Sequence, residues 1–369
     1  MRARTCLIVL TVLGVVVAGA LVPSLADGGA NHQRRNTHFG VSGGNVNDRS
    51  RAFCCSGTLG SLVTDGSTNY ILSNNHVLGR SDQAVAGEDI SQPGLIDVGC
   101  NVNSTTIVGD FTASSPFGSN VDASIAQLRT GTMDATGFIE DIGVPSRSVV
   151  APAVGMSVVK SGRTTGFTTG TISSINTSVS VQYQAGCGGG KKFTVAYTNQ
   201  IVIGPGSFSA GGDSGSLIVT NNSSHNPVGL LYAGSSSSTI ANRASEVLTR
   251  LSAVIGRSLT FVGSGTASPT ILSSSQSEVS PFLRGPRGQM QQLPEQAADR
   301  ALAVLELHRA NLMATPGVIG AGVGATAEDE TEPAIVIYID RTAPGRPQFA
   351  QSMDGIAVRI VLTDPFVAF

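Results

Sequence analysis

The spacing of apolar and polar positions divides the chain into a long β-rich region and a shorter mixed region. From about residue 39 to 262, short apolar runs recur about every ten residues between glycine-rich turn signals. Residues 58–63 and 69–73 flank Asp65-Gly66, which predicts a hairpin. This pattern predicts a closed or sandwiched antiparallel architecture. Further strands are predicted at residues 125–128, 157–160, 169–172, 179–183, 193–197, 201–203, 216–219 and 228–232.

Helical spacing of apolar residues occurs at two places. Residues 245–251 have apolar side chains on one face, and residues 294–313 repeat this pattern with Pro294 suited to a first turn. Apolar runs follow at 318–323, 334–339 and 356–362. One helix and three strands predict a small α+β domain that can hold its own core.

Residues 263–293 differ from both regions. They are rich in Ser, Thr and Gly, and later in Pro, Arg and Gln, which is typical of a linker. The predicted division is therefore a β-rich domain at 27–262, a linker at 263–293 and an α+β domain at 294–369.

The first 26 residues have the features of a cleavable export signal. A basic start is followed by an uncharged apolar run over residues 7–22 and by small residues at Ser24 and Ala26. The apolar run is shorter than the roughly 20 residues that a membrane helix needs, which favours cleavage over a membrane anchor. We therefore expect a secreted, extracellular protein with no stable membrane anchor after signal cleavage.

Composition argues against a nucleic-acid partner. The formal charge is −2 and charged residues make up 13% of the chain, so the basic stripe of a nucleic-acid binder is absent. Glycine occurs 45 times, which suits a β-rich chain with many tight turns.

Four cysteines remain after signal cleavage. An even number in an oxidising compartment predicts two disulfides. Adjacent cysteines rarely bond each other, so Cys54 and Cys55 are each expected to take one of Cys100 and Cys187, with the pairing left open. The pattern lacks a CxxC pair or clustered histidines, so no metal or other cofactor is expected.

Ser214 is the candidate nucleophile. It lies in the run Gly212-Asp213-Ser214-Gly215, whose glycines allow a tight turn. The N–H groups of Gly212 and Ser214 can then form an oxyanion hole. A serine also needs a base to take its proton and a third group to orient that base.

Two residues can supply the base and its partner. Of the five histidines, only His76 directly follows a predicted strand, and Asp122 stands at the mouth of the strand at 125–128. Taken alone, His76 could equally be a turn residue and Asp122 a strand-start cap. Their order before Ser214, at separations of 46 and 92 residues, resembles the triad of chymotrypsin-fold serine proteases.

Other segments extend this resemblance. Residues 161–166 with 170–172 are similar to a segment of secreted bacterial α-lytic-type proteases. Residues 73–76 and 208–216 resemble bacterial trypsin-like proteins related to the plant narrow-leaf-type proteases. Residues 294–369 resemble an accessory domain found beside such protease domains.

The resemblance implies a mainly β fold of two antiparallel six-stranded barrels, with the triad at their seam, followed by the small α+β domain. Trypsin's activating Ile-Val-Gly-Gly-like start is absent, so the resemblance implies Arg163 as the cation beside Asp213. The family's cysteine after the histidine is Val77 here. The resemblance also implies a substrate-binding group of four residues, with the first at the base of the primary pocket. These are Phe208, Tyr232, Ala233 and Gly234.

The function expected is a secreted serine endopeptidase acting on protein or peptide substrates. No acidic residue is evident in the primary pocket, so a small or apolar side chain is expected there. Two alternatives remain open. One is a catalytically idle binding module of the same fold, and the other is an esterase or self-processing hydrolase, for which the linker offers a flexible target.

Overall fold

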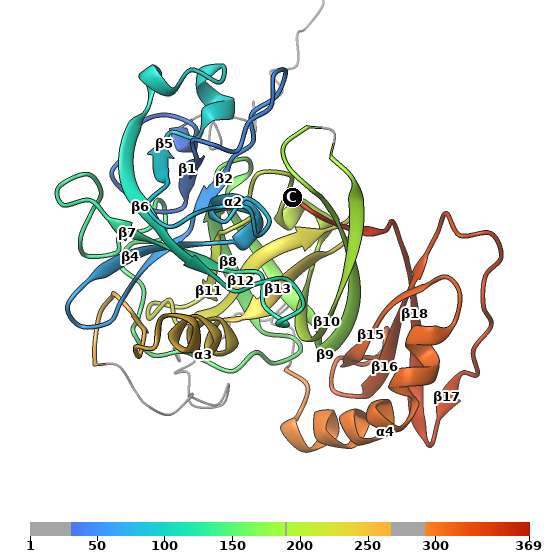
Figure 1. Cartoon of the computed structure of the whole chain (residues 1–369). Helices are drawn as coiled ribbons and strands as arrows, with labels where there is room; N and C mark the ends of the chain where they lie inside the picture. Colours follow the sequence, from blue (N-terminus) through green and yellow to red (C-terminus); the bar gives the residue numbers. More distant parts are fainter. Residues whose placement is uncertain (1–30, 189, 267–291) are drawn as a thin grey trace, which may run out of the picture.

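The computed structural model describes residues 31–188, 190–266 and 292–369 (Figure 1). The predicted export signal at 1–26 and most of the predicted linker lie outside the described residues. In the part of the chain that is described, helices long and apolar enough to cross a bilayer are absent.

The first barrel is formed by one sheet with the strand order β14-β3-β4-β7-β6-β5-β1-β2. Only Gly60 separates β2 from β3, so this continuous segment pairs with β1 at one end and β4 at the other and closes a ring of six. A side chain at Gly60 would overlap the carbonyl of Gly215, so glycine is required at this contact between barrels. The strands are β1 (Val41–Asn45), β2 (Gly57–Leu59), β3 (Ser61–Thr64), β4 (Asn69–Ser73), β5 (Asp89–Gln92), β6 (Thr106–Ser114), β7 (Ser124–Leu128) and β14 (Thr260–Phe261).

Short helices α2 (Asn75–Leu78), η1 (Leu95–Val98) and η2 (Val102–Ser104) connect these strands. The interior of the barrel is filled by aliphatic and aromatic side chains that the strands point inward. They include Leu59, Leu62, Ile71, Phe111 and Ile125.

The second barrel has the order β10-β13-β12-β11-β8-β9, and β9 pairs back onto β10 to close the ring. Helix α3 (Ala244–Ile255) then packs back on the first barrel's core through Val247 and Leu251. The elements are β8 (Ser157–Gly162), β9 (Gly166–Gln184), β10 (Lys192–Gly204), η3 (Gly206–Phe208), β11 (Leu217–Thr220), β12 (Pro227–Gly234) and β13 (Thr239–Arg243).

Residues 292–369 extend the sheet of the second barrel. Strand β15 pairs antiparallel with β9, from Gly320 opposite Val179 to Gly324 opposite Ser174. The two parts also share one apolar core, and Figure 1 shows this unit along one side of β9 and β10. Its elements are α4 (Glu295–Ala314), β15 (Val318–Ala325), β16 (Pro333–Asp340), β17 (Ser352–Met353), β18 (Ile356–Thr363) and β19 (Phe366–Ala368).

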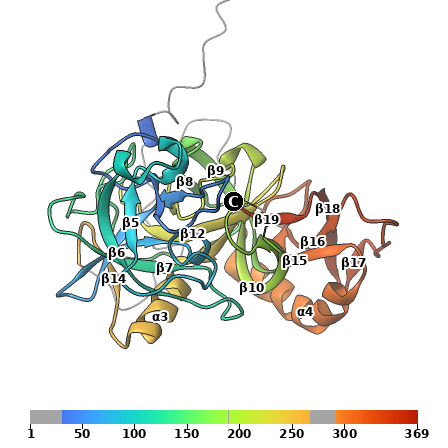
Figure 2. The same cartoon turned by 45° about the horizontal axis from the view of Figure 1, so that its top comes forward.

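The last strand leaves this unit and returns to the barrels. β19 lies between β12 and β9, antiparallel to the first and parallel to the second. Figure 2 shows the end of the chain beside β9 and β12, away from the rest of its own unit.

The predicted fold class is confirmed: the chain is mainly β, with two six-stranded barrels and a small α+β unit. Both predicted helices are confirmed within α3 and α4. The runs predicted as separate strands at 169–172 and 179–183 belong to one 19-residue strand, β9. Strand β1, with the sequence VSGGN, was missed because its buried side chains are too small to give an apolar signal.

Candidate active site

His76 and Asp122 are brought together by paired strands of the first barrel. β4 ends at Ser73 and leads into α2, which contains His76, while Asp122 precedes β7. The pairing of Ser73 with Ser124 holds the two chain segments side by side. Nδ1 of His76 lies 2.7 Å from Oδ2 of Asp122. The bond orients the imidazole and leaves Nε2 for another partner.

The carboxylate of Asp122 is fully buried and fully hydrogen-bonded. Its Oδ1 accepts from the backbone N–H groups of Asn75, at 2.7 Å, and His76, at 3.3 Å. Its Oδ2 accepts from the hydroxyl of Tyr183 at 2.9 Å, in addition to the imidazole. A buried carboxylate is costly unless it is paired in this way, so these donors fix its charge beside His76.

Two tyrosines of the second barrel support this carboxylate, and the sequence analysis missed both. Tyr183 of β9 and Tyr197 of β10 have hydroxyls 2.8 Å apart. Burial raises the pKa of both phenols, so they remain protonated and able to donate. The only sequence signal is a tyrosine at the end of each of two predicted apolar strands, which does not reveal a partner 61 residues away.

Both ring nitrogens of His76 face acceptors. Nε2 lies 3.1 Å from the main-chain oxygen of Phe369. A neutral imidazole has one N–H, so this arrangement requires the protonated ring. Burial lowers the pKa of His76. The charge and hydrogen bond of Asp122, the Phe369 carbonyl and the charge of Asp48 outweigh that effect, and the pKa is raised.

Ser214 lies in a turn that only glycine can complete. Gly212 and Gly215 both have positive φ, of 98° and 96°. A side chain at Gly215 would overlap Ser73 and the carbonyl of Thr58 in the first barrel. Among the hydrogen bonds of the described residues, none uses the N–H of Gly212 or Ser214, so both predicted oxyanion donors remain available.

Ser214 does not bond to His76 in this structure. Its Oγ donates to the carbonyl of Tyr232 at 3.2 Å. The same carbonyl accepts the N–H of Phe369 at 3.4 Å, and Phe369 in turn contacts His76. Ser214 and His76 are therefore connected through the Tyr232 carbonyl and Phe369 instead of by a direct hydrogen bond.

The predicted pairing of Arg163 with Asp213 is wrong. Arg163 pairs with Asp97, with Nε 2.8 Å from Oδ2. The cation nearest Asp213 is Lys160, whose Nζ lies 3.5 Å from Oδ2, and both side chains are fully buried. Lys160 is inside strand β8 and points into the barrel, whereas Arg163 follows the strand and points toward the first barrel's η1.

Further donors complete the surroundings of Asp213. Its Oδ1 accepts from the N–H of Thr164 at 2.8 Å, and its Oδ2 accepts from the hydroxyl of Thr165 and the N–H of Ala210. Burial lowers the pKa of Lys160. Through its hydrogen bonds, the Asp213 carboxylate holds the loop at 163–165 against the turn that carries Ser214.

Three of the four predicted substrate-binding residues form the end of a strand whose Tyr232 carbonyl bonds Ser214. Tyr232, Ala233 and Gly234 end β12, and β19 pairs with this end. Phe208 is fully buried, with Lys160 Nζ 5.9 Å from its ring centre. The hydroxyl of Tyr232 is buried and has no hydrogen-bond partner among the described residues.

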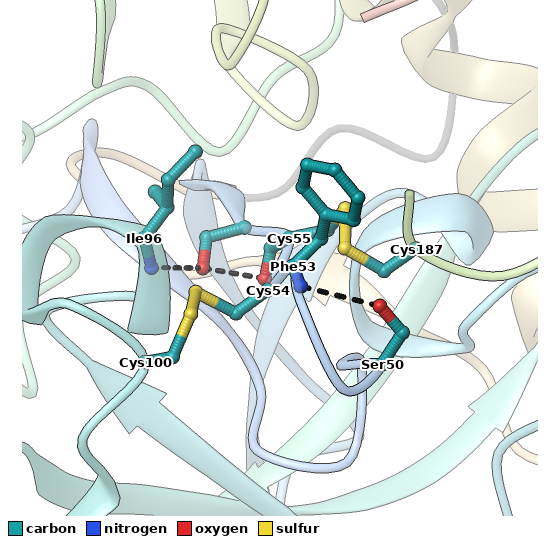
Figure 3. Close-up of a disulfide and its surroundings, with 8 residues drawn as sticks. Ser50, Phe53, Cys54, Cys55, Ile96, Cys100 and Cys187 are labelled. Atoms are coloured by element: carbon teal, nitrogen blue, oxygen red, sulfur yellow. Dashed lines mark hydrogen bonds between the residues drawn. A yellow bond between two sulfur atoms is a disulfide. The ribbon is translucent and has the colours of Figure 1, made fainter. Parts of the chain in front are cut away.

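Two disulfides border the site, and the pairing that the sequence left open is resolved. Cys54 bonds Cys100 and Cys55 bonds Cys187 (Figure 3). The second bond joins the first barrel to the tip between β9 and β10. Next to it is a cleft of about 290 Å³ that reaches the candidate site. Its walls include Cys55, His76, Cys187, Gly188, Gly212 and Phe369.

No group of three or more His, Cys, Asp or Glu side chains in the described ranges is arranged to hold a metal ion. The groups gathered at this site are a serine hydroxyl, an imidazole–carboxylate pair and two backbone N–H donors.

The chain is similar to bacterial chymotrypsin-fold serine proteases. A glutamic acid specific serine protease with a histidine triad in substrate binding is 21% identical, with a TM-score of 0.42, over 60% of this chain and 98% of that one. Thermobifida fusca protease A is 19% identical, with a TM-score of 0.41, over 62% and 99%. An alpha-lytic protease homolog, N4, is 19% identical, with a TM-score of 0.39, over 62% and 98%.

A family model described as the Nal1 C-terminal domain matches residues 81–259. No curated protein matches the sequence significantly.

Replacing Lys160 with methionine should destabilise the fold. Asp213 would keep a buried charge without its cation, a change that costs about 3–5 kcal/mol in the free energy of unfolding. The measurement is equilibrium denaturation by urea. The matched control is Arg341→Met, which removes the cation of a pair with Asp364 in which the two side chains are 43% and 39% exposed, and it should change stability little. Equal stability of Lys160→Met and the unmodified protein would contradict this account of Asp213.

Proposed function

We propose that this chain is a secreted serine endopeptidase that hydrolyses peptide bonds through an acyl-enzyme intermediate. His76, Asp122 and Ser214 form its triad in this proposal. The observation that carries it is the 2.7 Å bond from Nδ1 of His76 to a carboxylate held by three further donors, beside the Ser214 turn. The two disulfides fit an oxidising, extracellular compartment.

The reaction begins when Ser214 leaves its bond to the Tyr232 carbonyl and turns toward Nε2 of neutral His76. Its Oγ attacks the substrate carbonyl carbon while His76 takes the hydroxyl proton. Asp122 stabilises the resulting imidazolium. The developing oxyanion binds the N–H groups of Gly212 and Ser214.

Collapse of the tetrahedral intermediate breaks the peptide bond as His76 donates its proton to the leaving amine. Water then attacks the acyl-enzyme with His76 again acting as the base, which releases the acid product and restores Ser214. Because β12 presents a strand end beside Ser214, an extended peptide can pair with Tyr232, Ala233 and Gly234 through its main chain.

A fluorophosphonate probe should label the full chain at Ser214. Ser214→Ala should lose the label and reduce peptide hydrolysis by about 10⁶-fold, because the nucleophile is gone. The matched control is Ser216→Ala, which removes a neighbouring buried hydroxyl and should retain the label. Labelling that persists in Ser214→Ala would refute the assignment. A labelled enzyme that cleaves esters but no peptide would indicate an esterase, and no label in any variant would indicate an idle fold.

The hydroxyl of Tyr183 should act as a positioning group. Tyr183→Phe removes a donor from the buried Asp122 carboxylate and should lower kcat about tenfold with KM unchanged. Tyr70→Phe is the matched control, because its hydroxyl bonds Asp65 away from the site. Steady-state kinetics on a peptide substrate separate the two parameters. A change in KM alone would contradict the positioning role.

Activity should rise with pH as His76 loses its proton. Since the pKa of His76 is raised above its ordinary 6.5, the midpoint of kcat/KM should lie above pH 6.5. The charged side chains that act on the ring are those of Asp122 and Asp48, and burial raises the pKa of Asp48 to about 6. Asp122→Asn should move the His76 midpoint down, which NMR titration of the ring proton reports. A midpoint below 6.5 in the unmodified protein would contradict the charge balance described.

A further inference from the structure

The strand β19 fills the groove that a substrate of the proposed enzyme would use. It pairs antiparallel with the end of β12, with Val367 opposite Gly234 and Ala368 opposite Ala233. It also pairs in parallel with β9, with Phe366 opposite Val181. An extended peptide added to a strand edge is a general mode of main-chain recognition, and here the added strand belongs to the same chain.

Phe369 continues this strand to the candidate catalytic residues. Its N–H donates to the Tyr232 carbonyl at 3.4 Å, and its own carbonyl oxygen lies 3.1 Å from Nε2 of His76. Its ring lies so close to Gly234 that a side chain at that position would overlap it. Phe369 therefore contacts three parts of the site: the backbone of β12, the imidazole of His76 and Gly234.

We propose that residues 366–369 occupy the site as the acyl half of a bound substrate, so that the enzyme is inhibited by its own C-terminal segment and prefers a large apolar residue on the acyl side of the cleaved bond. This inference rests on the proposed function and adds a substrate class and a means of control.

The contacts at His76 account for the inhibition. Nε2 must accept the Ser214 proton for attack to occur, and here it is engaged by the Phe369 carbonyl. Ser214 is correspondingly bonded to Tyr232. The segment also occupies the only end of β12 that adjoins Ser214 in the described sheet, so a substrate must displace it.

The surroundings of the Phe369 ring account for the substrate class. The ring packs against Gly234 and against the edge of the apolar cluster that contains Phe208. The nearby polar pair, Ser209 with Thr239, is neutral and bonds to itself. Lys160, whose Nζ lies 5.9 Å from the Phe208 ring, is already paired with Asp213, so the pocket suits a large apolar side chain better than the small one that the sequence also allowed.

The cleft of about 290 Å³ continues past Phe369 between the first barrel and the β9–β10 tip. Such a space, lined by His76 and Gly212, can hold the leaving half of a substrate.

The rest of the C-terminal unit holds the segment at high local concentration. Phe366 is fully buried beside Tyr338, and β15 is paired with β9. Arg341 bonds Asp364 just before the segment. A tethered ligand competes at an effective concentration in the millimolar range, so a modest intrinsic affinity is enough to close the site.

Two substitutions in the full chain test this inhibition. Val367→Pro removes an N–H from a strand that is paired on both edges, and Phe369→Asp places a charge against an apolar wall. Each should raise the rate of fluorophosphonate labelling at Ser214 by at least about tenfold, because the tethered competitor is weakened. Leu307→Ala, an exposed apolar change on α4, is the matched control and should leave the rate unchanged. Equal rates in all four proteins would overturn the inference and leave the proposed function intact.

A binding measurement tests the same site without catalysis. The peptide Phe-Val-Ala-Phe should bind the full chain carrying Ser214→Ala with Val367→Pro, measured by calorimetry, and should bind at least about tenfold more weakly when position 367 is unchanged. A peptide ending in Asp in place of the last Phe should not bind. Absence of binding to the proline variant, or equal binding of the two peptides, would overturn the inference. Failure of every variant to label, with peptide binding retained, would instead overturn the proposed chemistry.

Discussion

The buried carboxylate of Asp122 constrains how the two barrels meet. A charge removed from water must be satisfied completely, and no single barrel supplies all of its partners. The first barrel offers the N–H groups of Asn75 and His76, whereas the second offers the hydroxyl of Tyr183. Asn242 of β13 binds the backbone N–H of Asp122 as well. The seam is thus fixed by the hydrogen-bonding demand of one side chain.

The second buried charge, Asp213, fixes the turn that carries Ser214, because its carboxylate also needs hydrogen-bond partners from several segments. It links β8, the loop after it and the turn, through Lys160, Thr164 and Thr165. Asp122 holds His76 in place, and Asp213 holds the turn of Ser214. The glycines at positions 60, 212 and 215 have no side chains, which allows the backbone to approach its neighbours closely around the Ser214 turn.

Much of this arrangement was predictable from sequence because it depends on local pattern. Turn signals and apolar runs predicted a closed or sandwiched antiparallel architecture, and the two barrels followed from the family resemblance. Strand-end positions singled out His76 and Asp122, whose side chains the structure brings together. Contacts between remote strands were not predictable, because nothing local distinguishes Tyr183 from other strand tyrosines. Lys160 was missed in favour of Arg163 because the direction of a side chain into or out of a barrel depends on register. The three-residue strand β19 is too short to give a periodic signal.

The contact between Gly234 and the ring of Phe369 has an evolutionary consequence. In the proposed enzyme, the same surface would select which peptides enter the groove and would set how firmly the chain's own segment stays there. A substitution that reshapes the wall would change both at once, and the segment could regain its fit only through a second change at its own end. In the proposed enzyme, substrate specificity and self-inhibition would depend on the same pair of positions, 234 and 369. A change of substrate during evolution would therefore require substitutions at both.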